Sequence, residues 1–162
     1  MNHSKIEKIN GKYLNLNINK QTNRIFFEEN GNGIPLICLH TAGSDSRQFR
    51  HLLNNKEIIS KYRVIAFDLP WHGKSDPPSN HMKIEYKLTT KSYMNIIINF
   101  CKALNLKNPV AIGCSMGGRI ALHLALKHSN FFKAVIALEG ADKLEPYYDL
   151  SWLNRPDVHG GE

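Results

Sequence analysis

The chain has 162 residues, enough for one domain with a buried core, and its 42% hydrophobic and 22% charged composition is typical of a globular protein. A formal net charge of +7 could indicate an acidic partner, but lysine and arginine are scattered, with no block of like charge. We therefore expect neither a nucleic-acid partner nor a membrane one. No run of about 18 apolar residues is present that could span a bilayer.

Cysteine usage points to a reducing compartment. Cys38, Cys101 and Cys114 are odd in number, unevenly spaced and without a CxxC motif. The first 20 residues contain no apolar stretch of signal-peptide length. We expect reduced thiols and a cytoplasmic location.

The first third of the chain is predicted to be mainly β-structure. Residues 13–19 alternate apolar and polar side chains, as in a half-exposed strand. Two β-prone runs then flank residues 30–33, Asn-Gly-Asn-Gly, which predicts a hairpin. Its second run, 35–39, is apolar on both faces, as in a central strand. Residues 46–59 have helical spacing of apolar side chains.

Strands and helices alternate in the remainder. Residues 62–68 read as a buried strand, and Thr89 or Thr90 can cap a helix that continues to Leu104. The other three expected elements are a strand at 110–114, a helix at 116–128 and a strand within 132–140.

This alternation predicts an α/β fold: a doubly wound, mostly parallel sheet with helices on both faces. We expect a core over residues 1–140. Residues 141–162 show no clear hydrophobic period, and we expect them to form a tail. Its large aromatic residues include Tyr147, Tyr148 and Trp152.

A polar or reactive residue follows each of the four expected inner strands. In open α/β sheets, ligands bind beyond the carboxyl ends of the strands, so these residues are expected at one edge. They are His40, Asp68, Ser115 and Glu139.

Ser115 carries the sharpest chemical signal. Residues 113–117 read Gly-Cys-Ser-Met-Gly, a G-x-S-x-G pattern between an expected strand and an expected helix. Glycines leave room for a sharp, strained turn that exposes the serine hydroxyl. The helix N-terminus favours a developing negative charge, and the Met116 N–H could donate to an oxyanion.

Two plainer interpretations compete with a nucleophilic serine. A glycine-rich strand-to-helix turn can exist without catalysis, and the motif alone occurs by chance. Cys114 is a rival nucleophile, which we expect to be a small buried residue.

Three ordered motifs within about residues 24–140 resemble the α/β-hydrolase family. "PLICLHTAGSDSRQF" resembles its first strand and oxyanion loop, and "VIAFDLPWHGKSDPP" resembles its Asp-x-x-x-His-Gly-x-Ser loop. "GCSMGG" matches its nucleophile elbow. The family implies an eight-stranded sheet, of which this chain could supply the first six, lacking the last two.

The resemblance also implies roles for the first loop. The Ala42 N–H would be the second oxyanion donor, and His40 and Thr41 would line the substrate site. Thr41 stands where the family usually has glycine, which predicts a different loop shape. His40 and His72 match structural positions of the family, where a hydrogen-bonded histidine is expected, and not its general base.

A credible catalytic histidine is missing. In the family it follows the eighth strand, whereas here His159 lies near the end of the sequence with no expected strand before it. His123 and His128 lie in the helix after Ser115 and should point away from its hydroxyl. Glu139 could be the acid that orients a histidine, or a plain polar residue at a strand end; both interpretations stay open.

These observations predict a serine hydrolase that cleaves an ester or related acyl bond of a small molecule through an acyl-enzyme. No metal or organic cofactor is implied. The chain itself should be a truncated form with little activity. The alternative is a non-catalytic hydrolase-like domain that binds a small molecule or a partner protein. An open sheet edge would also invite self-association.

Overall fold

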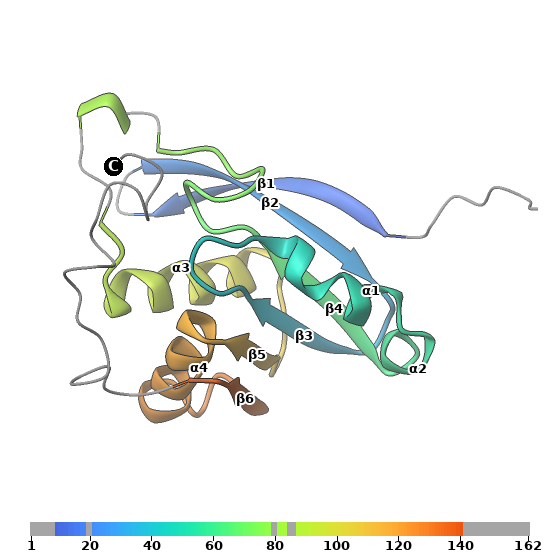
Figure 1. Ribbon diagram of the computed structural model, residues 1–162. Coiled ribbons are helices and arrows are strands. Elements are labelled where there is room, and N and C mark those ends of the chain that lie inside the picture. The colour runs from blue at the N-terminus through green and yellow to red at the C-terminus, as the bar shows by residue number, and fades with distance from the viewer. Residues whose placement is uncertain (1–8, 19–20, 79–80, 84–86, 141–162) are drawn as a thin grey trace, which may run out of the picture.

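The computed structural model describes residues 9–18, 21–78, 81–83 and 87–140, which form a six-stranded sheet flanked by helices (Figure 1). Strand order across the sheet is β1-β2-β4-β3-β5-β6. The strands are β1 (Asn10–Ile18), β2 (Gln21–Asn30), β3 (Ile34–Leu39), β4 (Tyr62–Phe67), β5 (Val110–Cys114) and β6 (Ala134–Leu138). The helices are α1 (Arg50–Asn54), α2 (Lys56–Ile59), α3 (Thr90–Ala103) and α4 (Met116–Lys127), with 3-10 turns η1 (Ser46–Phe49) and η2 (His81–Lys83).

Strands β3 to β6 run parallel, whereas β2 is antiparallel to both of its neighbours, β1 and β4. This arrangement confirms the predicted mostly parallel α/β sheet. The expected hairpin across residues 30–33 is wrong, because β4 lies between β2 and β3. The turn is instead tied to the segment that leads into β4: the Asn32 N–H donates to the Ile59 carbonyl at 3.4 Å and the Ile34 N–H to the Lys61 carbonyl at 3.1 Å.

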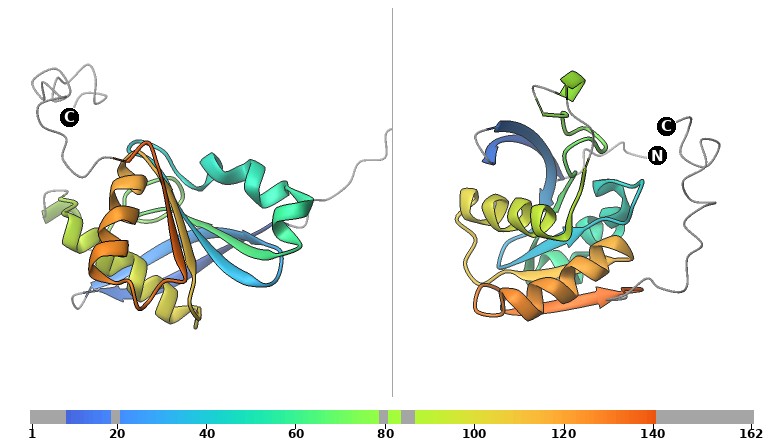
Figure 2. Two further views of the ribbon diagram at one scale, coloured as in Figure 1. Left: turned by 90° about the horizontal axis from the view of Figure 1, so that it is seen from below. Right: turned by 90° about the vertical axis from the view of Figure 1, so that its left-hand side faces the viewer.

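Helices α3 and α4 cover one face of the sheet, as the views in Figure 2 show. Thr89 caps α3 through the capping box expected at this position, its side chain accepting from the Ser92 N–H. Phe100 of α3 is fully buried and stacks on Phe67 of β4, with ring centroids 4.6 Å apart. Phe27 of β2 meets the same ring edge-to-face. These three rings belong to the larger of the two hydrophobic clusters, which packs α3 against the middle of the sheet.

Helices α1 and α2 cover the other face over β3 and β4. Phe49 and Leu53 are buried there against Cys38 and Val64. The single helix expected over 46–59 is broken, because Asn55 takes an extended backbone conformation. Its side chain accepts hydrogen bonds from the N–H groups of the next turn and so starts α2.

The expected tail, 141–162, lies outside the described residues. Within the part of the chain that the structure describes, no helix has the length and apolar character needed to cross a membrane.

Candidate active site

The four residues that follow β3 to β6 lie at one edge of the sheet because these strands are parallel. Registers bring their ends into line: Leu39 is the partner of Gly113, and Cys114 is the partner of Leu138. Each of the four strands is followed directly by one of the expected residues. These residues are His40 after β3, Asp68 after β4, Ser115 after β5 and Glu139 after β6. The structure therefore brings these four residues to one edge of the sheet, where the sequence placed them.

Ser115 lies at the apex of a strained turn between β5 and α4. Its φ of 53° and ψ of −113° are unusual for a residue with a side chain, and Ser115 is exposed. The Ser115 N–H donates to the Leu138 carbonyl at 2.9 Å, which ties the apex to the end of β6. This geometry directs a hydroxyl to solvent at the N-terminus of a 12-residue helix.

Glycines around Ser115 are required by close backbone contacts. A Cβ on Gly117 would collide with the carbonyl oxygen of Leu39 and lie 3.0 Å from that of His40. A Cβ on Gly113 would collide with the backbone of Gly117 itself. The first turn of α4 can therefore approach β3 and β5 only without these side chains.

The loop after β3 faces this turn. The Thr41 N–H donates to Gln48 Oε1 at 2.8 Å, and the Ser44 N–H donates to the Thr41 carbonyl at 3.3 Å. Thr41 does not have a positive φ, whereas Gly43 does, at 65°. The bend is therefore made at Gly43, and the Thr41 N–H is already engaged by Gln48.

Two backbone N–H groups remain as candidate oxyanion donors. Ala42 is exposed, and among the described residues no hydrogen bond involves its N–H. Met116 is the first residue of α4, where N–H groups have no intrahelical partner.

His40 is held by its own backbone surroundings. Its Nε2 accepts from the Leu69 N–H at 3.2 Å, and its Nδ1 donates to the Thr41 carbonyl at 2.8 Å, which requires the neutral ring. Burial lowers the pKa of His40 below its usual value, in agreement. With 1% exposure and both nitrogens engaged, the ring is unsuited to the substrate contact expected of it. It instead joins the loops after β3 and β4.

Asp68 connects the same two loops. One carboxylate oxygen accepts from the Ser46 N–H and the other from the Lys74 N–H, both at 2.7 Å. The Asp68 carbonyl accepts from the Ser75 hydroxyl at 2.7 Å. A Cβ on Gly73, whose φ is 53°, would collide with the Asp68 carboxylate. Asp68 thus fixes the loops on both sides of β4.

Neither histidine of α4 lies beside Ser115, and His72 is engaged within the loop after β4. His72 has Nδ1 3.0 Å from the Pro70 carbonyl and packs on His40. His123 and His128 lie about 10 Å and 18 Å further along the α4 axis than Met116, at 1.5 Å per residue. His159 lies outside the described residues.

Glu139 is exposed and lies directly after Leu138, the residue that accepts from the Ser115 N–H. Its φ is 50°, so a second strained non-glycine residue adjoins Ser115 at this edge. The placement is compatible with either interpretation of Glu139, as an orienting acid or as a strand-end residue.

Cys114, the rival nucleophile, is half-buried in β5 and not fully buried as expected, while Cys38 and Cys101 are buried. Burial raises the pKa of the Cys101 thiol to about 12 and that of Cys38 further.

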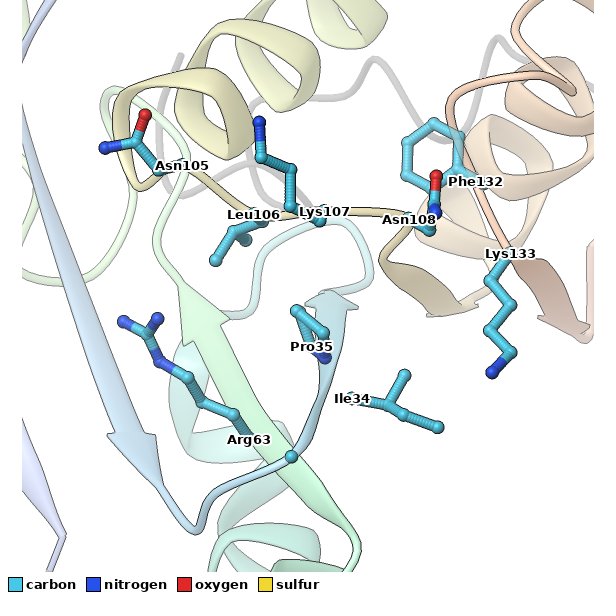
Figure 3. Close-up of a pocket in the computed structure, with 10 residues that line it drawn as sticks. Ile34, Pro35, Arg63, Asn105, Leu106, Lys107, Asn108, Phe132 and Lys133 are labelled. Carbon is cyan, nitrogen blue, oxygen red and sulfur yellow. The ribbon is translucent and has the colours of Figure 1, made fainter.

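A cavity of about 830 Å³ lies at the opposite edge of the sheet, beyond the amino ends of the strands (Figure 3). Pro35 and Leu106 lie near its centre, while Arg63, Lys107 and Lys133 point in different directions at its border. Arg63 is already paired with Glu29. The three cationic side chains therefore do not converge on one point of the cavity.

Sequence reasoning missed Gln48 and Asp45. Asp45 accepts from the Arg47 N–H at 2.9 Å and starts η1, and an Asp before a polar turn is a recognisable cap signal. Gln48 had no such signal, because its contact with Thr41 depends on the path of the loop.

Residues 34–157 match the family model described as alpha/beta hydrolase fold, and the chain belongs to this family. The 2-hydroxy-6-oxo-6-(2'-aminophenyl)hexa-2,4-dienoic acid hydrolase of Metapseudomonas resinovorans is 31% identical, over 94% of this chain and 54% of that protein. An uncharacterized hydrolase of Bacillus subtilis is 28% identical over 76% of this chain and 48% of its own. The chain thus spans about half the length of these curated relatives.

Solved structures agree on the fold. The N-acyl homoserine lactonase AidH is 28% identical with a TM-score of 0.64, over 76% of this chain and 42% of that chain. The epoxide hydrolase of Vigna radiata has a TM-score of 0.66 over 82% of this chain and 38% of that chain, at 20% identity, and shows the fold alone.

We predict that Asp68→Asn lowers the free energy of unfolding by about 2 kcal/mol, because one buried backbone N–H would face an amide instead of a carboxylate oxygen. Denaturant unfolding measures this loss. Asp76→Asn is the matched control: Asp76 is exposed in a 3.4 Å ion pair with Arg24, and its replacement should cost less than about 0.5 kcal/mol. Equal effects of the two substitutions would contradict the role of Asp68.

A second prediction concerns pH. Burial keeps the His40 pKa low in the folded state, so the unfolded chain binds an extra proton as the pH falls below about 6.5. Stability should therefore decrease from pH 6.5 to 5. His40→Gln, which keeps an acceptor for the Leu69 N–H, should reduce this slope by up to about 1.4 kcal/mol per pH unit. A slope that His40→Gln leaves intact argues against the buried neutral ring.

Proposed function

We propose that the chain is the nucleophile-bearing part of a serine hydrolase that cleaves an ester or related acyl bond of a small molecule. The observation that carries this proposal is the exposed hydroxyl of Ser115 on a turn with a φ of 53°, at the start of α4. Backbone strain of this kind clusters at functional sites, where the surrounding structure maintains it. Similarity to an N-acyl homoserine lactonase supports an acyl bond as the target.

In the proposed reaction, Ser115 Oγ attacks the carbonyl carbon and its proton passes to a general base. Negative charge then develops on the carbonyl oxygen, and the N–H groups of Ala42 and Met116 stabilise it. The tetrahedral intermediate collapses to an acyl-enzyme, and the protonated base gives its proton to the leaving oxygen, which departs as the alcohol. Water then hydrolyses the acyl-enzyme and restores the Ser115 hydroxyl.

The proposed reaction needs a general base, and neither His40 nor a histidine of α4 is placed to be that base. His40 has both ring nitrogens engaged, and the histidines of α4 lie too far along the helix. Glu139 is the candidate for the acid that orients a base. Without the base and its acid, only the oxyanion hole and substrate binding contribute, and serine proteases lose on the order of 10⁴ to 10⁶ in rate in that case. The 162-residue chain should therefore be nearly inactive alone.

We expect a fluorophosphonate probe to label the purified chain slowly and only at Ser115. Labelling is measured by mass spectrometry of the peptide that contains residues 114–116. Ser115→Ala should abolish it. Cys114→Ala is the matched control and should label at the wild-type rate, because the thiol lies beside the apex of the turn.

Several results would contradict parts of this proposal. Label that persists in Ser115→Ala, or that disappears in Cys114→Ala, would remove Ser115 as the nucleophile. Rapid ester turnover by the chain, lost in Ser115→Ala, would support the reaction but contradict the expected inactivity. A complete lack of label would favour the alternative, a hydrolase-like domain that only binds its ligand.

A further inference from the structure

Gln48, in η1, holds the loop that carries Ala42 through a single backbone group. Its side-chain Oε1 accepts from the Thr41 N–H at 2.8 Å. The accepting atom must be the amide oxygen, because a backbone N–H can only donate. Gln48 is half-buried and takes no part in the steps of the proposed reaction. Whatever it contributes to that reaction must therefore act through Thr41.

The peptide bond between His40 and Thr41 lies between α4 and Gln48. A Cβ on Gly117 would lie 3.0 Å from the His40 carbonyl oxygen, so this oxygen faces the first turn of α4. The carbonyl and N–H groups of a trans peptide point in opposite directions, and the Thr41 N–H therefore points away from α4. Gln48 accepts from it on that side. The same peptide is thus packed on α4 and hydrogen-bonded to Gln48.

The next peptide bond, between Thr41 and Ala42, carries the proposed oxyanion donor. The Thr41 carbonyl accepts from His40 Nδ1 at 2.8 Å and from the Ser44 N–H at 3.3 Å. The second bond closes a tight turn, in which Gly43 has the positive φ that a type II turn requires of its third residue. Because the carbonyl is held inside this turn, the Ala42 N–H of the same peptide points out of it.

We propose that Gln48 is a positioning residue for oxyanion stabilisation: by holding the Thr41 N–H, it fixes the direction of the Ala42 N–H. The inference rests on the function proposed above, since it concerns the same oxyanion site. Only two rotatable backbone bonds, those of Thr41, separate the two peptides. Without an acceptor, the half-buried Thr41 N–H would be unpaired, and a rotation that found it a new partner would redirect the Ala42 N–H. Donors to an oxyanion must be positioned in advance.

Three variants separate the hydrogen bond from the packing of the side chain. Gln48→Met and Gln48→Glu both keep nearly the length of glutamine, but only glutamate keeps an oxygen acceptor at its end. Arg50→Met is the matched control, because Arg50 is exposed two residues further along the chain. Denaturant unfolding identifies conditions in which each variant is folded. Gln48→Leu, which also lacks the acceptor, replaces Gln48→Met if that variant does not fold.

Hydrogen exchange of the Thr41 amide, followed by NMR, tests the contact itself. The amide should be protected in the wild type, in Gln48→Glu and in Arg50→Met. It should exchange at least about fivefold faster in Gln48→Met, as expected for the loss of one hydrogen bond of ordinary strength.

Fluorophosphonate labelling of Ser115 tests the consequence for the site. The maximal labelling rate should fall about tenfold in Gln48→Met, less than the loss expected when an oxyanion donor is removed outright. The probe concentration that gives half of this rate should not change, because the charge on the phosphonyl oxygen develops only in the transition state. Gln48→Glu should recover to within about threefold of the wild-type rate, since its acceptor is restored.

The outcomes distinguish this inference from the proposed function. A wild type that labels at Ser115, together with a Gln48→Met variant that labels equally fast, would overturn the positioning role alone. So would a Thr41 amide that stays protected in Gln48→Met, a Gln48→Glu variant that does not recover, or an equal loss of rate in Arg50→Met. A wild type that does not label at all would contradict the proposed function, and the positioning role with it.

Discussion

The close approach of the first turn of α4 to the sheet is the constraint on which the candidate site depends. At the positions of Gly113 and Gly117 there is no space for a side chain between α4, β3 and β5. The chain must therefore reverse within a few residues, and Ser115 takes a strained conformation with a positive φ of 53° at the apex. The N–H of this strained residue is fixed to the end of β6 through the Leu138 carbonyl. Packing of backbone on backbone thus orients the serine before any ligand binds.

The loop that carries Ala42, the other part of the candidate site, is held in place by buried polar groups. The Asp68 carboxylate and the His40 ring accept or donate hydrogen bonds only with backbone groups of the loops after β3 and β4. The exposed Ala42 thus lies in a loop whose flanking residues are held in place. Satisfied buried networks of this kind rigidify the groups around them. Oxyanion stabilisation requires such donors to be positioned in advance.

The sequence predicted the features that local patterns encode. The strand, the glycines and the helix around Ser115 lie within 20 residues, and parallel strands necessarily bring their carboxyl ends to one edge. The hairpin at residues 30–33 was wrong because β4, about 30 residues later, inserts between its strands. The break at Asn55 and the Gln48–Thr41 contact also depend on how distant segments pack. His40 is hydrogen-bonded, as its resemblance to a structural position led us to expect, but its partner Leu69 comes from the loop after β4 and had no local signal.

The central claim is that Ser115, Ala42 and Met116 form one preorganised site. A crystal structure of the chain after prolonged reaction with a phosphonylating reagent tests it most directly. The account predicts phosphorus on Ser115 Oγ, with its free oxygen about 2.7–3.1 Å from the N–H nitrogens of both Ala42 and Met116. An adduct whose oxygen points to solvent, with neither N–H within hydrogen-bond distance, would contradict the account.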